Sequence, residues 1–162
     1  RAGAIRSATI AAVGFAAGRE LLLRPLDLND PFDARVARHL EEDEVGWLTT
    51  VSPDGTPQPT PVWFLYDGTT LLIYSQPNQA KERNIARNPR VSFNFNTDAG
   101  GVDVVVITGS AAVDQNAAPA LDSPAYLAKY GEPIVGIGMT PETFSQTYSV
   151  PIRFYPERLR GS

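Results

Sequence analysis

The side chains that most often carry chemistry on their own are scarce in this chain. It has no cysteine and a single histidine, His39, which excludes thiolate nucleophiles, disulfides, zinc–thiolate sites and clusters of metal-ligating histidines. The nucleophile motif G-x-S-x-G, the zinc motif H-E-x-x-H and the P-loop are also absent. We therefore expect any redox chemistry to belong to a bound cofactor, and the sequence assigns no catalytic residue.

Three other features have simpler interpretations than a functional site. His39 lies on an expected helix, where a surface or packing histidine is favoured over a general base. The four acidic residues 41–44 are expected to form a solvated helix end, so we predict no metal site. The segment Gly136-Ile137-Gly138-Met139 lacks the third glycine and the preceding strand of a dinucleotide-binding loop.

The most informative residues surround the start of a short expected helix. Ser75-Gln76-Pro77-Asn78 opens this helix, which runs to about Asn88 and places Lys81 in its first turn. Free N–H groups and the helix dipole make such a position favourable for phosphate. The alternatives are that Lys81 pairs with a surface carboxylate and that Ser75 caps the helix. Gln79 and Asn84 could hydrogen-bond either a cofactor or the helix itself.

The rest of the chain predicts short elements that must position these groups. Asp30-Pro31 is expected to start a helix. Pro57, Pro59 and Pro61 alternate in the second expected strand, so one edge of it cannot pair fully. Gly109 predicts a bulge or a bend in the fifth strand. Strands are expected over residues 45–51, 56–66, 70–74, 90–96, 102–113 and 149–155, and the first three form an antiparallel meander. Short helices are expected from Ser123-Pro124 to Gly131 and from Thr140-Pro141.

About six antiparallel strands with few helices predict a mainly β protein, a small barrel with short helices rather than a parallel α/β sheet. The 162 residues suit one domain over 26–162, preceded by an N-terminal extension over 1–25. We favour an extension or helical arm there over an export signal, and its apolar part, 8–17, is too short to span a bilayer. The net charge of −4 argues against nucleic-acid binding. We expect a cytoplasmic protein with no membrane partner.

Five segments, in this order and spacing, resemble the flavin-binding split-barrel superfamily that includes the pyridoxamine 5'-phosphate oxidases. The segments are 47–50, 59–64, 74–76, 79–84 and 88–92. The nearest resemblance is to the actinobacterial branch that uses the deazaflavin coenzyme F420, and it extends from about Asp30 to the C-terminus. The resemblance implies a split β-barrel of the FMN-binding type and a homodimer with the cofactor in a groove at the dimer interface.

The matched positions also imply how the cofactor is held. In the oxidases a Tyr-Thr pair contacts the cofactor phosphate, and Tyr74-Ser75 matches it. A Ser-Arg-Lys run is matched by Gln79-Ala80-Lys81, so the lysine is retained and the arginine is lost. Pro59 stands where the oxidases have a second arginine. Loss of both arginines favours F420 over FMN.

In the deazaflavin branch, segments like Pro59 to Trp63 lie against the tricyclic ring, although Trp63 could simply be a core residue. Together these arguments predict the cofactor-binding residues Pro59, Thr60, Pro61, Val62, Trp63, Tyr74, Ser75, Gln76, Gln79, Lys81 and Asn84.

The implied activity is hydride transfer between reduced F420 and an unidentified small organic substrate. Tyr126, Tyr130 and Tyr148 are weak candidates for the proton donor, and water is the alternative. Two other functions stay open, an FMN-dependent oxidase or reductase on the same barrel and a non-enzymatic F420 carrier or sensor.

Overall fold

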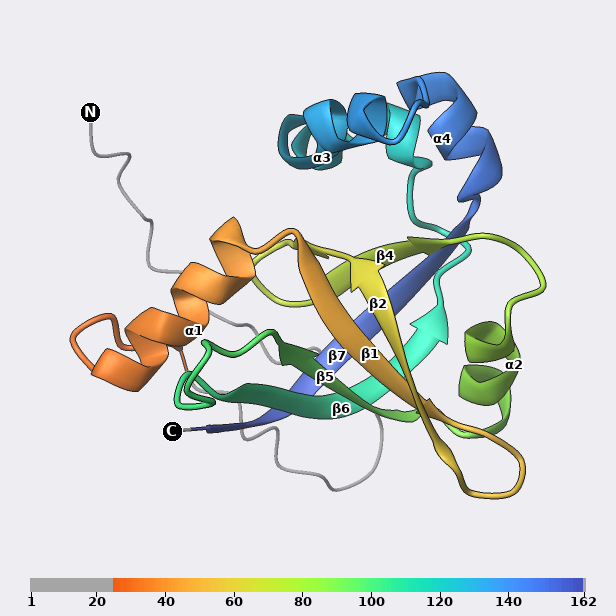
Figure 1. Cartoon of the computed structure of the whole chain (residues 1–162). Helices are drawn as coiled ribbons and strands as arrows, with labels where there is room; N and C mark the ends of the chain where they lie inside the picture. The colour runs from red at the N-terminus through yellow and green to blue at the C-terminus, as the bar shows by residue number, and fades with distance from the viewer. Residues whose placement is uncertain (1–24, 162) are drawn as a thin grey trace.

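The computed structural model of this protein describes residues 25–161, so the interpretations of residues 1–24 lie outside it. Seven antiparallel strands form one strongly curled sheet in the order β2-β1-β5-β6-β7-β4-β3 (Figure 1). The prediction of a mainly β split barrel with short helices is confirmed. The elements are α1 (Pro31–Glu42), β1 (Val45–Val51), β2 (Pro57–Trp63), β3 (Leu65–Tyr66), β4 (Leu71–Ser75), α2 (Ala80–Arg87), β5 (Arg90–Phe95), β6 (Val105–Val113), a 3-10 helix (Ala120–Asp122), α3 (Pro124–Gly136), α4 (Pro141–Thr147) and β7 (Val150–Gly161).

The strand expected over 56–66 is broken at Phe64, so the predicted continuous meander is wrong. β2 pairs only with β1, and β3 pairs only with β4, which places the two pieces at opposite edges of the sheet. The Phe64 N–H donates instead to the hydroxyl of Tyr130 at 2.8 Å. The alternating prolines are compatible with β2 because an edge strand has one side that needs no partner.

Two other boundaries differ from the sequence prediction, and one local feature is confirmed. β6 begins at Val105 rather than at residue 102, and its register against β7 shifts between Thr108 and Gly109, as expected for a bulge. A Cβ at Gly109 would collide with the carbonyl oxygen of Tyr155. α3 continues past Gly131 to Gly136, because Ile134 beyond the glycine is fully buried and anchors the added turn.

The apolar side chains form two separate clusters. One fills the barrel, where Leu48, Phe64, Phe93 and Phe154 are fully buried. The other lies between β4 and the layer formed by α3 and α4, which stands above one end of the barrel in Figure 1. The second cluster is unusually aromatic, and it contains one wall of the pocket described below.

α1 begins at its predicted cap, because the Asp30 carboxylate accepts the backbone N–H groups of Phe32 and Asp33 at 3.0 Å. Of the alternatives for His39, the structure shows the packing histidine. Its ring is 4% exposed and stacks on Phe95 with the ring centroids 4.9 Å apart. Within residues 25–161, no helix has the length and apolar character needed to cross a membrane.

Candidate functional site

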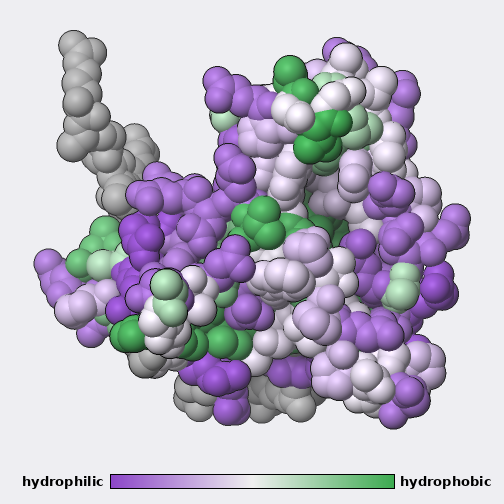
Figure 2. Space-filling view, in the orientation of Figure 1, coloured by the Kyte–Doolittle hydropathy of each residue, from purple (hydrophilic) through white to green (hydrophobic). Residues whose placement is uncertain are grey.

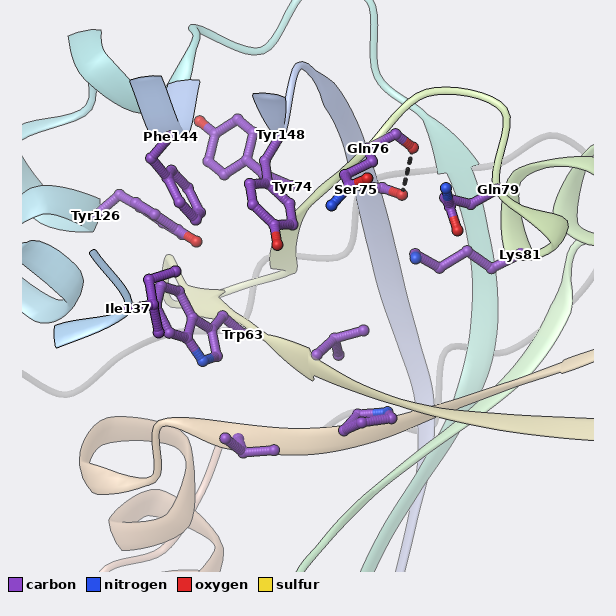
Figure 3. A pocket seen from close by; sticks show the side chains of 13 residues that line it. Trp63, Tyr74, Ser75, Gln76, Gln79, Lys81, Tyr126, Ile137, Phe144 and Tyr148 are labelled. Atoms are coloured by element: carbon purple, nitrogen blue, oxygen red, sulfur yellow. Dashed lines mark hydrogen bonds between the residues drawn. The ribbon is translucent and has the colours of Figure 1, made fainter. Parts of the chain in front are cut away.

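A cavity of about 350 Å³ lies between the ends of β2 and β4, the start of α2 and the α3–α4 layer (Figure 3). In the space-filling view, apolar surface lies in the hollow between the α3–α4 lobe and the barrel (Figure 2). The cavity is lined by Val45, Pro61, Val62, Trp63, Tyr74, Ser75, Gln76, Gln79, Lys81, Tyr126, Ile137, Phe144 and Tyr148. Most of the predicted cofactor-binding residues are therefore brought together at one place.

One half of the cavity is polar and is built by the β4–α2 connection. Here Ser75, Gln76, Gln79 and Lys81 lie on the same side of the cavity in Figure 3. The helix begins later than predicted, with Gln79 as its N-cap, so Ser75 is the last residue of β4 and does not cap α2. The Ser75 hydroxyl donates to the Gln76 carbonyl at 2.9 Å and contacts Oε1 of Glu82 at 3.3 Å.

Lys81 is the second residue of α2 and points into the cavity (Figure 3). No carboxylate among residues 25–161 lies within ion-pair distance of its ammonium group, so the structure does not show the alternative of a surface pair. Burial lowers the pKa of Lys81, and the charge of Glu82 opposes that shift only in part. A half-buried cation without a partner, at the start of a helix, is suited to receive an anion.

The two arginines of α2 serve the fold rather than the cavity. Arg83 donates to the carbonyl of Asn78 at 2.8 Å, and Arg87 donates to the carbonyl of Val51 at 2.6 Å. Neither lines the cavity, so Lys81 is the one cation among the lining residues that the structure describes. The polar half thus offers a single positive charge.

Three of the predicted residues lie outside the cavity. Asn84 is 4% exposed, and its side-chain amide donates to Thr50 Oγ1 at 3.0 Å and to Gln58 Oε1 at 2.9 Å. These two donated hydrogen bonds therefore go neither to the cavity nor to the helix itself, and instead link α2 to strands β1 and β2. Pro59 and Thr60 belong to β2 but do not line the cavity, and Pro59 is exposed at the sheet edge.

The other half of the cavity is aromatic and comes mainly from the C-terminal helices. Trp63 stacks on Tyr130 with centroids 4.8 Å apart and on Phe144 at 5.6 Å. Phe144 in turn stacks on Tyr148 at 4.5 Å. Trp63 is therefore both a packing residue and a cavity wall. The sequence did not predict Val45, Ile137 and Phe144 as lining residues, because their position depends on how the α3–α4 layer docks on the barrel.

The three tyrosines considered as proton donors have different environments. Tyr130 does not line the cavity, and its hydroxyl lies 2.7 Å and 2.8 Å from the carbonyl oxygens of Phe64 and Glu44. Tyr126 and Tyr148 do line it. Burial raises the pKa of both Tyr126 and Tyr130, so their hydroxyls stay protonated at neutral pH.

Comparison with known proteins assigns the class. Residues 32–153 match the family model of pyridoxamine 5'-phosphate oxidase. The chain belongs to this family, whose members bind flavin-type cofactors.

Solved structures with the same fold include three informative relatives. A Listeria innocua protein assigned as a pyridoxamine 5'-phosphate oxidase is 28% identical, with a TM-score of 0.57 over 78% of this chain and 94% of that one. An F420 reductase is 26% identical, with a TM-score of 0.56 over 76% and 94% of the two chains. HutZ, a haem storage protein from Vibrio cholerae, is 17% identical, with a TM-score of 0.57 over 80% of this chain and 94% of that one. This similarity shows a shared fold and carries no information on function.

Proposed function

We propose that this protein is an F420-dependent oxidoreductase that transfers hydride between reduced F420 and a small organic substrate. The observation that carries the proposal is Lys81, a half-buried cation with no ion pair within residues 25–161, at the polar end of a cavity whose other end is aromatic. The polar end fits the phosphate of a cofactor, the β2 residues Pro61 and Val62 fit its ring, and the aromatic end stays open to a second planar molecule. The similarity to an F420 reductase supports the choice of cofactor.

The charge of the polar half favours F420 over FMN. A phosphate monoester such as that of FMN carries about −1.5 to −2 charges at pH 7. The phosphate of F420 is a diester and carries a single negative charge. Lys81 is the one cation among the described lining residues, so it balances a diester and leaves a monoester undercompensated.

The protein's own groups would bind and orient the ligand and exclude water. Lys81 and backbone N–H groups at the start of α2 would hold the phosphate, with the side chain of Gln79 beside them. Bound F420 would supply the hydride. The aromatic wall of Trp63 and Phe144 would keep water from the reacting carbon.

An FMN-dependent enzyme is the second candidate. The 28% identity to an assigned pyridoxamine 5'-phosphate oxidase favours it, whereas the single cation among the described lining residues argues against it. A cofactor carrier would use the same cavity without accelerating any reaction.

We further propose a homodimer. The apolar sequence of residues 102–107 would suit an interface, but Val105 and Ile107 are buried inside the barrel itself and do not support one. Val135 and Ile137, at the end of α3, are 66% and 53% exposed and offer apolar surface to a partner.

A single-turnover experiment distinguishes an enzyme from a carrier. Reduced F420 is bound to excess protein and mixed with a panel of quinones and α,β-unsaturated carbonyl compounds, and recovery of the oxidised cofactor's absorbance is followed. We expect at least one acceptor to be reduced faster than by free reduced F420. Tight binding with no acceleration for any acceptor would contradict an enzymatic role. Acceleration with reduced FMN alone would establish the second candidate.

A further inference from the structure

The hydroxyl of Tyr126 is a buried polar group without a partner. The residue is 0% exposed, and its oxygen has no hydrogen-bond partner among the described residues. A buried hydroxyl that makes no hydrogen bond destabilises a fold, so nearly all such groups in native proteins are paired. A group that stays unpaired within a ligand-sized cavity indicates a partner that arrives with the ligand.

Tyr130, one helical turn further along α3, provides the internal comparison. It is also 0% exposed, but its hydroxyl accepts the Phe64 N–H at 2.8 Å and contacts two carbonyl oxygens. Tyr74 on β4, whose ring packs edge-on against that of Tyr126 with centroids 4.9 Å apart, donates to the carbonyl of Ala118 at 2.6 Å. Each of these neighbouring tyrosines has a structural partner, whereas Tyr126 has none.

The position of Tyr126 defines what its partner must be. In Figure 3 its hydroxyl points toward the interior of the aromatic half, between Phe144 and Tyr74. Burial raises the pKa of Tyr126, so the hydroxyl is a donor and not an anion. Its surroundings are flat aromatic rings, of which Phe144 lies nearly parallel to Tyr126, with centroids 5.9 Å apart and an interplanar angle of 29°. The oxygen is closed off from solvent, so a hydrogen-bond acceptor can reach it only when a ligand displaces these aromatic rings.

We infer that the aromatic half of the cavity is the substrate subsite, and that it takes a planar, largely apolar ring whose carbonyl oxygen accepts a hydrogen bond from Tyr126. This inference rests on the proposed function, because it assigns the polar half to the cofactor phosphate. It makes Tyr126 the residue that selects substrates with a carbonyl over apolar rings of the same size. A ring carbonyl also makes an adjacent unsaturated carbon electron-poor, as a hydride acceptor must be.

The test compares chromone, a planar bicycle with a ring carbonyl, with naphthalene, a bicycle of similar size without an acceptor. Binding of both probes is measured by equilibrium dialysis on the full chain, with and without saturating F420. The wild type should prefer chromone. Tyr126→Phe should weaken chromone binding about tenfold, the value of one hydrogen bond, and leave naphthalene unchanged. Unchanged chromone affinity in Tyr126→Phe, or an equal loss for both probes, would overturn the inference.

A thermal measurement separates this role from a purely structural one. Ligand-free Tyr126→Phe should melt at or above the wild-type temperature, because it removes an unpaired polar group. Tyr130→Phe should melt lower, because it leaves the Phe64 N–H without an acceptor. If Tyr126→Phe melts as low as Tyr130→Phe, the hydroxyl is structural and the inference is wrong.

The cofactor also has ring carbonyls, and a titration of F420 distinguishes the two sources. We expect Tyr126→Phe and the wild type to bind F420 equally. Weaker F420 binding with unchanged chromone binding would assign the acceptor to the cofactor and overturn the substrate subsite. If neither F420 nor FMN binds but the preference for chromone depends on Tyr126, the subsite stands and the proposed function fails.

Discussion

Replacing Lys81 by alanine removes the single cation among the described lining residues while leaving the barrel intact. The side chain makes no ion pair with any carboxylate in residues 25–161, so no partner is left unpaired. A charge-assisted hydrogen bond to phosphate contributes about 1.5–3 kcal/mol. We therefore expect Lys81→Ala to weaken F420 binding by roughly 10- to 150-fold, since about 1.4 kcal/mol is tenfold.

The ligand-free variant should be no less stable than the wild type. A cation in the first turn of a helix opposes the helix dipole, and alanine has the higher helix propensity. The change should raise the free energy of unfolding by a few tenths of a kcal/mol. Urea unfolding of both proteins measures this free energy. It also tests whether a loss of affinity in the variant is caused by unfolding.

Isothermal titration at low and high salt, and across alkaline pH, completes the test. The affinity lost in Lys81→Ala should shrink as salt rises, because a half-buried charge is partly screened. Burial lowers the pKa of Lys81, so wild-type affinity should be constant below that pKa and fall as the pH rises through it. The variant should show no such alkaline decline.

Arg83→Ala is the matched control, because it removes a positive charge from the same helix without touching the cavity. It should change the affinity less than about twofold, as expected for a screened surface charge. Equal affinities of Lys81→Ala and the wild type at low salt would mean that the phosphate lies elsewhere. An equal loss in Arg83→Ala would mean that net charge, rather than a contact, controls binding.

Three further predictions concern the fold and the assembly. Gly109→Ala forces a Cβ onto the Tyr155 carbonyl at the β6–β7 bulge and should lower the free energy of unfolding by about 1–3 kcal/mol or more, measured by urea denaturation. Asn84→Ala should cost about 1–3 kcal/mol in the same assay, because it removes a buried hydrogen-bonded amide, and a larger effect on F420 affinity than on stability would assign Asn84 to the site instead. Light scattering at micromolar concentration with cofactor present should give the mass of a dimer, and a monomer would contradict the proposed interface.

The features that the sequence predicted well are those encoded by neighbouring residues. Asp30 can cap α1 because the N–H groups it accepts are two and three residues away. The prolines of β2 restrict it to a sheet edge by their own missing N–H groups. The bulge at Gly109 follows in the same way from one residue type in an otherwise regular strand.

The features that could not be predicted from the sequence depend on contacts between segments that are distant in the chain. The break at Phe64 is stabilised by the Tyr130 hydroxyl, which is 66 residues away in the chain. The polar half of the cavity was predictable because Ser75, Gln79 and Lys81 lie close together in sequence. The aromatic half was not, because it forms only where the α3–α4 layer meets Trp63.

Parallel titrations of F420, FMN and FAD into the purified protein test most directly whether this cavity prefers F420. The single positive charge beside the aromatic wall predicts that F420 binds more tightly than FMN. Micromolar or tighter binding of FMN, together with no measurable binding of F420, would contradict this preference and the proposed cofactor.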